Sequence, residues 1–319
     1  MGRYILRRLL LAIPTLLVIS FVIFAILALA PGDPMAQFGA NPNVPAEVRQ
    51  RIRASLGLDQ PWPVRYVKWV TAMVRGDWGF SFASRMPVTT LIGQRLPQTL
   101  WVVGVAYVIA IAIAIPVGII SAVKQYSLFD KMATTIAFMG FSVPTFFTGL
   151  LLILIFSVKL NWFPSIYDTS VRVTDFASFI RQVRQMVLPI AVLALFQSAS
   201  TARFMRSSML DNLPQDYVRT ARAKGLSEQK VILRHVLTNS LIPVVTLIAL
   251  GVPSIFAGAI ITEQVFRVNG LGELLISSIT KSDTPVVMAL TFIFAILVVL
   301  FNLVADVLYG LLDPRIRYD

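Results

Sequence analysis

Six apolar stretches, each long enough to cross a lipid bilayer, constrain this chain more than any other feature of its sequence. A helix needs about 20 apolar residues to span the hydrocarbon core of a membrane. Inside that core every backbone N–H and C=O group must be bonded within the protein, which favours helices. The sequence therefore predicts an all-α integral membrane protein with six transmembrane helices, at roughly 9–30, 99–121, 132–157, 186–206, 241–262 and 286–311.

The composition agrees with a membrane protein and excludes several kinds of site. Of the 319 residues, 56% are hydrophobic and only 14% are charged, whereas soluble domains average about 25% charged residues. The absence of cysteine excludes a disulfide framework and a thiolate metal site, and one histidine, His235, leaves little for histidine-based catalysis. We attribute the net charge of +12 to cytoplasmic loops and anionic lipid surfaces, not to nucleic acid.

The distribution of lysine and arginine predicts that both termini are cytoplasmic. With the N-terminus inside, the inner segments carry 14 basic residues and the two short outer loops carry 6, as the positive-inside rule requires. The first stretch, Leu9 to Ala30, exceeds the length of a signal-peptide core and lacks a clear cleavage site, so we expect a retained anchor. The inner segments are 1–8, 122–131, 203–240 and 312–319, and the short outer loops are 158–185 and 263–285.

The outer segment 31–98 is too long for a simple connection, so we expect it to be structured. Apolar residues at helical spacing between Pro45 and Gly57 predict one short amphipathic helix. Aromatic and apolar side chains from Trp62 to Met73 predict a second, suited to a membrane interface, and Gly76 to Gly79 form a turn. The segment is either a lid over the outer mouth or a docking surface for an external partner, and both interpretations remain open.

Glycine, proline and polar side chains interrupt several predicted spans. Gly140 and Pro144 fall within the third, where small residues allow close packing and proline leaves a carbonyl for a neighbour to satisfy. In the fourth, four of the five residues from Gln197 to Thr201 are polar, and at membrane depth such side chains should face protein or water. We expect part of this cluster to line a translocation path, with Gln197, Ser198 and Thr201 as the candidates.

The spans lack the groups that drive transport or catalysis in many membrane proteins. Asp306 is the only acid well inside a predicted span, near its inner end, and we expect it to pair with the backbone or a nearby arginine. The lack of a mid-membrane carboxylate or lysine argues against an ion-coupled carrier, and the lack of H-E-x-x-H and G-x-S-x-G sequences argues against an enzyme. No phosphate-binding G-x-x-x-x-G-K-[ST] loop is present, so energy for active transport must come from another chain.

Residues 213–243 form a basic, helix-prone island between the fourth and fifth spans. Asp216 is predicted to cap a short helix that runs to Lys224 and that Gly225 ends in the left-handed conformation. Ser227 is then predicted to cap a second helix. Such an element has neither lipid nor a core of its own in which to bury its surface, so we expect it to bind a partner protein.

Several short motifs occur in order along the chain. The most specific runs from Asp216 to Ser227, with Pro243 downstream. Together the motifs resemble the membrane permease subunits of bacterial ABC importers, in their dipeptide/oligopeptide branch, and the run from Asp216 resembles the EAA loop of that family. Arg219 and Thr220 depart from the general loop pattern, which has glutamate and alanine there, whereas Ala221 matches. The other matching segments are Arg7 to Pro14, Pro31 to Pro34, Gly76 to Gly79, Arg206 to Leu210, Arg234 to His235, Asn239 to Pro243 and Leu308 to Arg315.

The resemblance implies a type I ABC importer permease fold with a cytoplasmic coupling helix. It divides the chain into an N-terminal transmembrane helix, an extracytoplasmic segment, a five-helix permease core with the coupling loop 207–240, and a cytoplasmic tail. The boundaries are 1–30, 31–98, 99–311 and 312–319. The resemblance also implies that Thr220 and Ala221 are small enough for close docking of an ATP-binding subunit, and that the basic residues pair with acidic groups on it. The residues implied in this contact are Asp216, Tyr217, Arg219, Thr220, Ala221, Arg222, Ala223, Lys224 and Gly225.

The resemblance further implies partners, location and cargo. A homologous second permease, two ATP-binding subunits and an extracytoplasmic substrate-binding protein would complete a transporter in the inner membrane of a bacterium. This chain would hold no cofactor, because ATP and magnesium would be bound by the ATP-binding subunits. The implied cargo is a di- or oligopeptide. A nickel or other metal chelate, or glutathione, is the alternative within the family, and a channel or ion-coupled carrier is a distant one.

Overall fold

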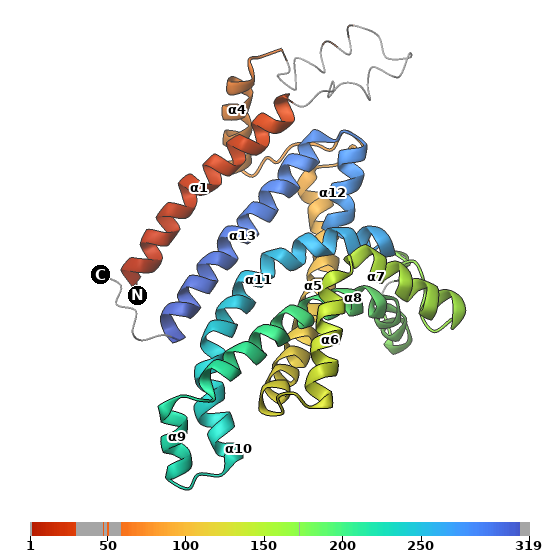
Figure 1. The fold of residues 1–319 in the computed structure, drawn as a ribbon. Coiled ribbons are helices and arrows are strands. Elements are labelled where there is room, and N and C mark those ends of the chain that lie inside the picture. Colours follow the sequence, from red (N-terminus) through yellow and green to blue (C-terminus); the bar gives the residue numbers. More distant parts are fainter. Residues whose placement is uncertain (1, 30–46, 48–49, 51–58, 172, 313–319) are drawn as a thin grey trace.

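The computed structural model describes residues 2–29, 47, 50, 59–171 and 173–312, and these are almost entirely α-helical. In this part of the chain no strand forms beyond an isolated bridge between Phe80 and Pro87. Five helices here are long and apolar enough to cross a membrane, which confirms the predicted all-α membrane class. The spanning stretches lie in α1 (Gly2–Leu29), in α5 (Val88–Val123), in α8 (Phe176–Asn212), in α11 (Leu237–Phe266) with the residues from Glu228 that lead into it, and in α13 (Thr284–Leu312) (Figure 1).

The third predicted span is not one continuous helix. Residues 132–157 were expected to form a single helix, but the structure contains α6 (Leu128–Ser142), α7 (Thr145–Leu152) and a π-helix, η1 (Ile153–Lys159), with a bend of 105° between α6 and the rest. Pro144 explains the break, because proline has no N–H to donate and disfavours the helical conformation of the residue before it. Val143 accordingly adopts an extended conformation, with φ −90° and ψ 126°. If the bent pair counts as one span, the described residues contain six.

The second amphipathic helix predicted in the outer segment is present as α4 (Trp62–Val74). It lies beside α1 at the upper end of the molecule in Figure 1. The ring of Tyr66 is 5.3 Å from that of Phe21 on α1, and the ring of Trp69 is 6.2 Å from that of Phe292 on α13. Aromatic packing therefore attaches α4 to two of the spans. The helix predicted between Pro45 and Gly57 lies largely outside the described residues.

A fully buried carboxylate, Glu263, fixes the short helix α12 (Leu271–Thr280) to the upper ends of α5 and α11. It accepts hydrogen bonds from Thr99 Oγ1 at 2.7 Å and from the N–H groups of Gly272 and Glu273 at 2.7 and 3.2 Å. These N–H groups belong to the first turn of α12, where no partner exists within the helix itself. Glu263 lies one residue beyond the end predicted for the fifth span and was not singled out in the sequence.

In the sequence, Gly270 could have indicated that Glu263 is buried beside it, because a residue with a Cβ atom does not fit there. A Cβ atom at position 270 would lie 2.2 Å from Glu263 Oε1, so a larger residue would displace the carboxylate. A second buried carboxylate, Asp283, accepts hydrogen bonds from Ser81 Oγ at 2.5 Å and from the Phe82 N–H at 3.0 Å. The loops at the upper end are thus held by hydrogen bonds to two buried carboxyl groups.

Asp306 forms the ion pair expected from the sequence. Its carboxylate lies 3.1 Å from the guanidinium of Arg8, which joins the lower part of α13 to α1. The helices α5 and α8 pack tightly at Gly118, where a Cβ atom would lie 2.6 Å from Met205 Cβ. The helices α5, α8 and α11 share a buried apolar cluster around Val102, Val192 and Phe256.

Candidate functional site

The basic island forms a short helix, α9 (Asp216–Ala223), that projects from the lower end of the molecule between α8 and α11 (Figure 1). The expected N-cap is wrong by one residue. Gln215 occupies the cap position in an extended conformation without a side-chain cap bond, and Asp216 is the first helical residue. The carboxylate of Asp216 still lies at the helix N-terminus, where negative charge is stabilised by the helix dipole.

The C-terminal end of α9 forms a left-handed turn at Gly225, as the sequence predicted. Gly225 has φ +75°. Its N–H donates to the Arg222 carbonyl at 2.9 Å, and the N–H of Leu226 donates to the Ala221 carbonyl at 3.4 Å. This pair of bonds defines a Schellman motif, in which glycine is favoured because it lacks a Cβ atom.

One side of α9 packs against its own chain. Val218 is fully buried and Ala221 is 5% exposed, and both belong to an apolar cluster with Met205 and Met209 of α8. The Tyr217 hydroxyl donates a hydrogen bond of 2.6 Å to Asn212 Oδ1 at the end of α8. Ala221, which the sequence predicted to be small enough for close docking of a partner, points its side chain inward in this chain.

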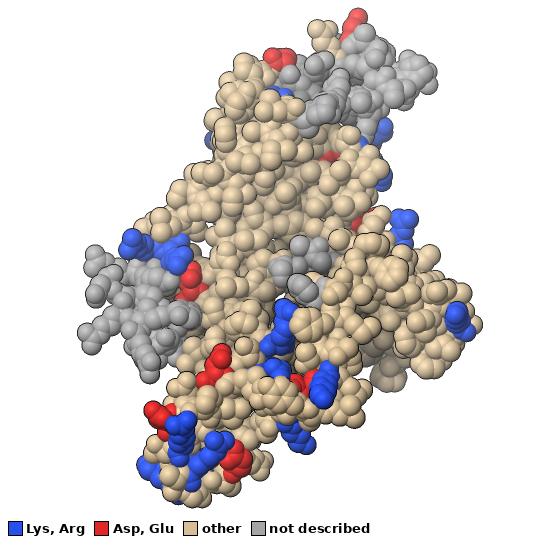
Figure 2. Space-filling view, viewed as in Figure 1, with Lys and Arg blue, Asp and Glu red and all other residues tan. Residues whose placement is uncertain are grey.

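The opposite side of α9 is exposed and carries most of its charge. Figure 2 shows lysine, arginine and acidic side chains gathered at this lower end. Arg219 is 72% exposed and lies 3.6 Å from Asp216 on the same helix. Thr220, Ala223 and Lys224 are also exposed. A partner that approaches this surface therefore meets mainly basic and small side chains.

Arg222 forms an ion pair within the chain. Its Nε and Nη2 atoms donate to the two oxygens of Glu228, at 3.0 and 2.6 Å, across the turn at Gly225. The hydrogen bonds to Glu228 raise the pKa of Arg222 above its usual value. Arg222 is therefore engaged by its own chain, and Arg219 and Lys224 are the stronger candidates for contact with an acidic partner.

The second helix predicted after the turn is not a separate element. Ser227 occupies the cap position of α10 (Glu228–Lys230), but its side chain forms no cap bond. The chain then continues through a π-helix, η2 (Val231–Val236), directly into α11. The element that follows α9 is thus the lower end of a membrane-spanning helix.

The polar cluster of α8 faces the protein interior. Gln197 and Ser198 are each 7% exposed and Thr201 is fully buried. Gln197 lies against α11, where a Cβ atom on Gly251 would be 3.0 Å from Gln197 Nε2. Ser198 donates to the Leu195 carbonyl at 3.0 Å, and Thr201 Oγ1 has no hydrogen-bond partner among the described residues. Of the three candidates, only Ser198 lies on the wall of the cavity described next.

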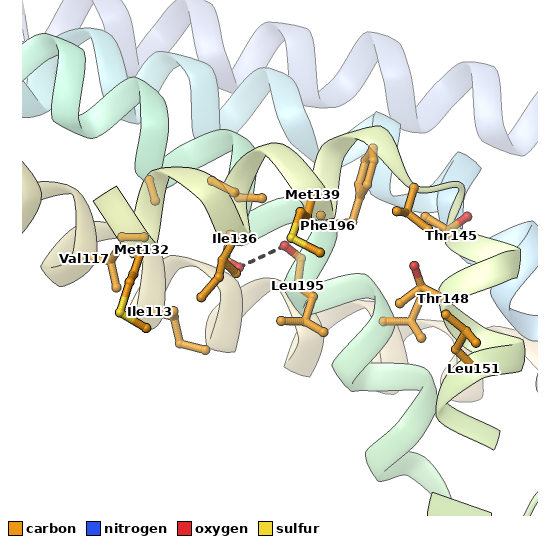
Figure 3. A pocket seen from close by; sticks show the side chains of 18 of the residues that line it. Ile113, Val117, Met132, Ile136, Met139, Thr145, Thr148, Leu151, Leu195 and Phe196 are labelled. Carbon is orange, nitrogen blue, oxygen red and sulfur yellow. Dashed lines mark hydrogen bonds between the residues drawn. The ribbon is translucent and has the colours of Figure 1, made fainter. Parts of the chain in front are cut away.

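An apolar cavity of about 550 Å³ lies between α5, α6, α7 and α8, on both sides of the bend at Pro144. Figure 3 shows Met132, Ile136 and Met139 from α6 and Leu195 from α8 on its wall. Thr145 and Thr148, at the start of α7, lie at the same wall and contribute hydroxyl groups. The cavity therefore suits an apolar occupant better than a charged one.

The arrangement of spans and projecting helix agrees with a family assignment. Residues 114–318 match the model of the binding-protein-dependent transport system inner membrane component, and residues 1–103 match the N-terminal model of such membrane components. The chain belongs to this family. It is a multi-pass permease subunit of a bacterial ABC transporter in the inner membrane, and it is not itself an enzyme.

Relatives match over the full length. The chain is 44% identical over 319 residues, 100% of both chains, to the oligopeptide transport system permease protein AppB of Bacillus subtilis. It is 40% identical over 318 residues, again 100% of both chains, to the glutathione transport system permease protein GsiC of Escherichia coli K12. A crystal structure of an amino acid ABC transporter with histidines aligns with a TM-score of 0.54 at 13% identity, over 69% of this chain and 94% of that one, which shows a shared fold.

Among the described residues, no group of three or more histidine and acidic side chains is arranged to hold a metal ion. The charged clusters of this part of the chain are instead internal ion pairs, such as Arg206 with Asp130 at 2.7 Å and Arg95 with Glu273 at 3.0 Å.

Proposed function

We propose that this chain is the permease subunit of an importer that carries di- or oligopeptides, driven by ATP hydrolysis on two partner subunits. The relative with 44% identity is named for oligopeptide transport, which supports this cargo. Glutathione is the second candidate, because it is a tripeptide derivative and relatives with 40% identity are named for it. A nickel or other metal chelate is the remaining alternative within the family.

The observation that carries the proposal is the form of α9. Its buried side is anchored to α8 and α11 through Val218 and Ala221, and its exposed side presents Arg219 and Lys224. A helix held rigidly at one side and open at the other suits the transfer of force from a partner protein to the spans. We propose that α9 is the coupling helix and docks on an acidic groove of an ATP-binding subunit.

The proposed assembly has this chain beside a homologous second permease, with two ATP-binding subunits at the α9 end and a substrate-binding protein at the α4 and α12 end. Both termini are then cytoplasmic, because Arg8 and Asp306 lie toward the same end as α9. Alternating access of a path between the two permeases would move the peptide. We propose that Gln197, Ser198 and Thr201 lie beside this path and that Ser198 contributes to its wall.

Charge reversal on the exposed side of α9 tests the coupling assignment. In the assembled transporter, Arg219→Glu with Lys224→Glu should weaken co-purification of the ATP-binding subunit by at least about tenfold, since loss of interfacial ion pairs costs about 2 kcal/mol or more. Lys281→Glu, an exposed change at the opposite end, is the matched control. Wild-type assembly and ATP-driven uptake by the α9 variant would show that α9 is not the coupling helix.

The cargo is tested separately, with the cognate substrate-binding protein. Its affinity for di- to pentapeptides, glutathione and a nickel chelate is measured by calorimetry, and uptake of the tightest ligand is measured in proteoliposomes. We expect peptides to bind most tightly. Selective binding of glutathione would establish the second candidate, and selective binding of the nickel chelate would overturn both.

A further inference from the structure

The motif Arg206 to Leu210 lies near the lower end of α8 and has no role in the docking surface of α9. Its arginine reaches a different helix. Arg206 Nε and Nη2 donate to Asp130 Oδ1 and Oδ2 of α6, at 2.7 and 2.8 Å. The Asp130 side chain is 4% exposed and that of Arg206 is 25% exposed, so water screens this bidentate pair much less than a surface pair.

Asp130 is also held by the turn that precedes its helix. Its Oδ2 atom accepts from the Tyr126 N–H at 2.9 Å, and its own N–H donates to Ser127 Oγ at 3.2 Å. These contacts fix the carboxylate to the first turn of α6. A force applied to Asp130 therefore acts on the whole lower end of α6.

The same segment of α8 is joined to α11 and α9. Ser208 Oγ donates to the Ser240 carbonyl at 2.8 Å, and Ser240 Oγ donates to the Ser208 carbonyl at 3.1 Å, with both side chains buried. Met205 and Met209 pack in the apolar cluster that contains Val218 of α9. The lower ends of α8 and α11 and the helix α9 are thus one closely packed block.

The helix α6 connects this block to the cavity. Met132, Ile136 and Met139, which follow Asp130 along α6, line the cavity (Figure 3). A movement of α9 that carries α8 with it can therefore reach this wall through Arg206 and Asp130, in addition to direct packing such as that of Arg203 over the Phe138 ring at 5.6 Å. The Arg206–Asp130 ion pair is a charged contact between α6 and the block formed by α8, α9 and α11. Among the described residues, no other such contact lies closer to α9 in the sequence.

We propose that Asp130 and Arg206 are positioning residues that transmit the movement of α9 to α6 and so link ATP hydrolysis to the shape of the cavity. This inference rests on the proposed role of α9 as a coupling helix. It assigns the motif Arg206 to Leu210 a function in force transmission, separate from contact with the ATP-binding subunit.

The test compares transport per ATP hydrolysed in proteoliposomes that contain the complete transporter. Asp130→Asn and Arg206→Met should each reduce this ratio by at least about fivefold, the lower end of the usual range for coupling between sites. Each single change also leaves an unpaired, partly buried group, so a drop in thermal stability is expected. Removal of the Arg8–Asp306 pair by Arg8→Met with Asp306→Asn, which affects α1 and α13, is the control and should leave the ratio unchanged.

The double variant Asp130→Asn with Arg206→Met separates transmission from stability. When both charges are removed, neither Asp130 nor Arg206 leaves a buried charge without its partner. The thermal stability of the double variant should therefore recover toward that of the parent. Transport per ATP hydrolysed should stay low, because the ion pair that connects α8 to α6 is still missing. Recovery of both quantities together, or an unchanged ratio in the single variants, would overturn the inference and leave only a structural role.

A distance measurement gives a second readout. The chain contains no cysteine, so spin labels can be attached at Lys131→Cys on α6 and Ser207→Cys on α8, both exposed. On ATP binding we expect the distance between the labels to stay constant in the parent and to change in the double variant. A constant distance in both would contradict the inference. If the parent transporter showed no ATP-driven uptake at all, the proposed function would fail first, and the inference with it.

Discussion

At the scale of single residues, two glycines of α5 show how neighbours set the role of a residue type. Gly118 is buried, and a Cβ atom there would lie 2.6 Å from Met205 Cβ and 2.8 Å from the Ala202 carbonyl oxygen. Gly104 is exposed, and a Cβ atom added there would have no other atom within 4 Å. The first glycine is therefore required for the close approach of α5 and α8, and the second is not.

We expect Gly118→Ala to destabilise the protein by about 1–3 kcal/mol, the usual cost of overpacking, because backbone atoms of α8 must move. Gly104→Ala on the same helix should be neutral or stabilising by up to about 1 kcal/mol, because alanine favours the helix more than glycine. Thermal unfolding of the purified proteins in detergent measures both. Equal midpoints for the two variants would contradict the close packing at Gly118.

At the scale of elements, the bend between α6 and α7 determines the shape of the cavity. The break depends on Pro144 and on the extended conformation of Val143. Pro116 lies within α5 without breaking it, which shows that proline alone does not force a bend of this size in a membrane helix. Neighbouring helices must also favour the bent arrangement.

We expect Pro144→Ala to open the bend, because alanine restores the missing N–H and releases Val143 from its restriction. Spin labels at Thr135→Cys and Leu154→Cys would report the change, since a straight helix would place the two Cα atoms roughly 28 Å apart at 1.5 Å per residue. The measured distance should lengthen toward that value, and cargo uptake should fall. Pro116→Ala is the control, and an unchanged distance in the Pro144 variant would mean that packing alone holds the bend.

At the scale of the whole molecule, the two ends differ in chemistry. The lower end carries α9 and the turn before α6, and the upper end carries α4, α12 and the two buried carboxylates Glu263 and Asp283. An upper end whose loops are bonded to two buried carboxyl groups suits the capture of a separate protein, and an exposed basic helix suits contact with a motor protein. The proposed orientation places these ends outside and inside the cell.

Single cysteines test that orientation directly, because the natural chain has none. In intact cells without their outer membrane, a membrane-impermeant maleimide should label Lys281→Cys, which is exposed at the upper end. It should label Lys124→Cys, exposed at the lower end, only after the membrane is made permeable. The reverse pattern would invert the orientation and place α9 outside.

Features that depend on neighbours along the chain could be predicted from the sequence. Helices in lipid satisfy their own backbone groups, so apolar length predicted the spans other than the bent third one, and Gly225 predicted the turn after α9. The direction in which each side chain faces depends on packing and became visible in the fold. Packing turned Ala221 inward, paired Arg222 with Glu228, buried Glu263 and joined Asp130 to Arg206. Such contacts link residues brought together by packing, and their partners have no fixed spacing in the sequence.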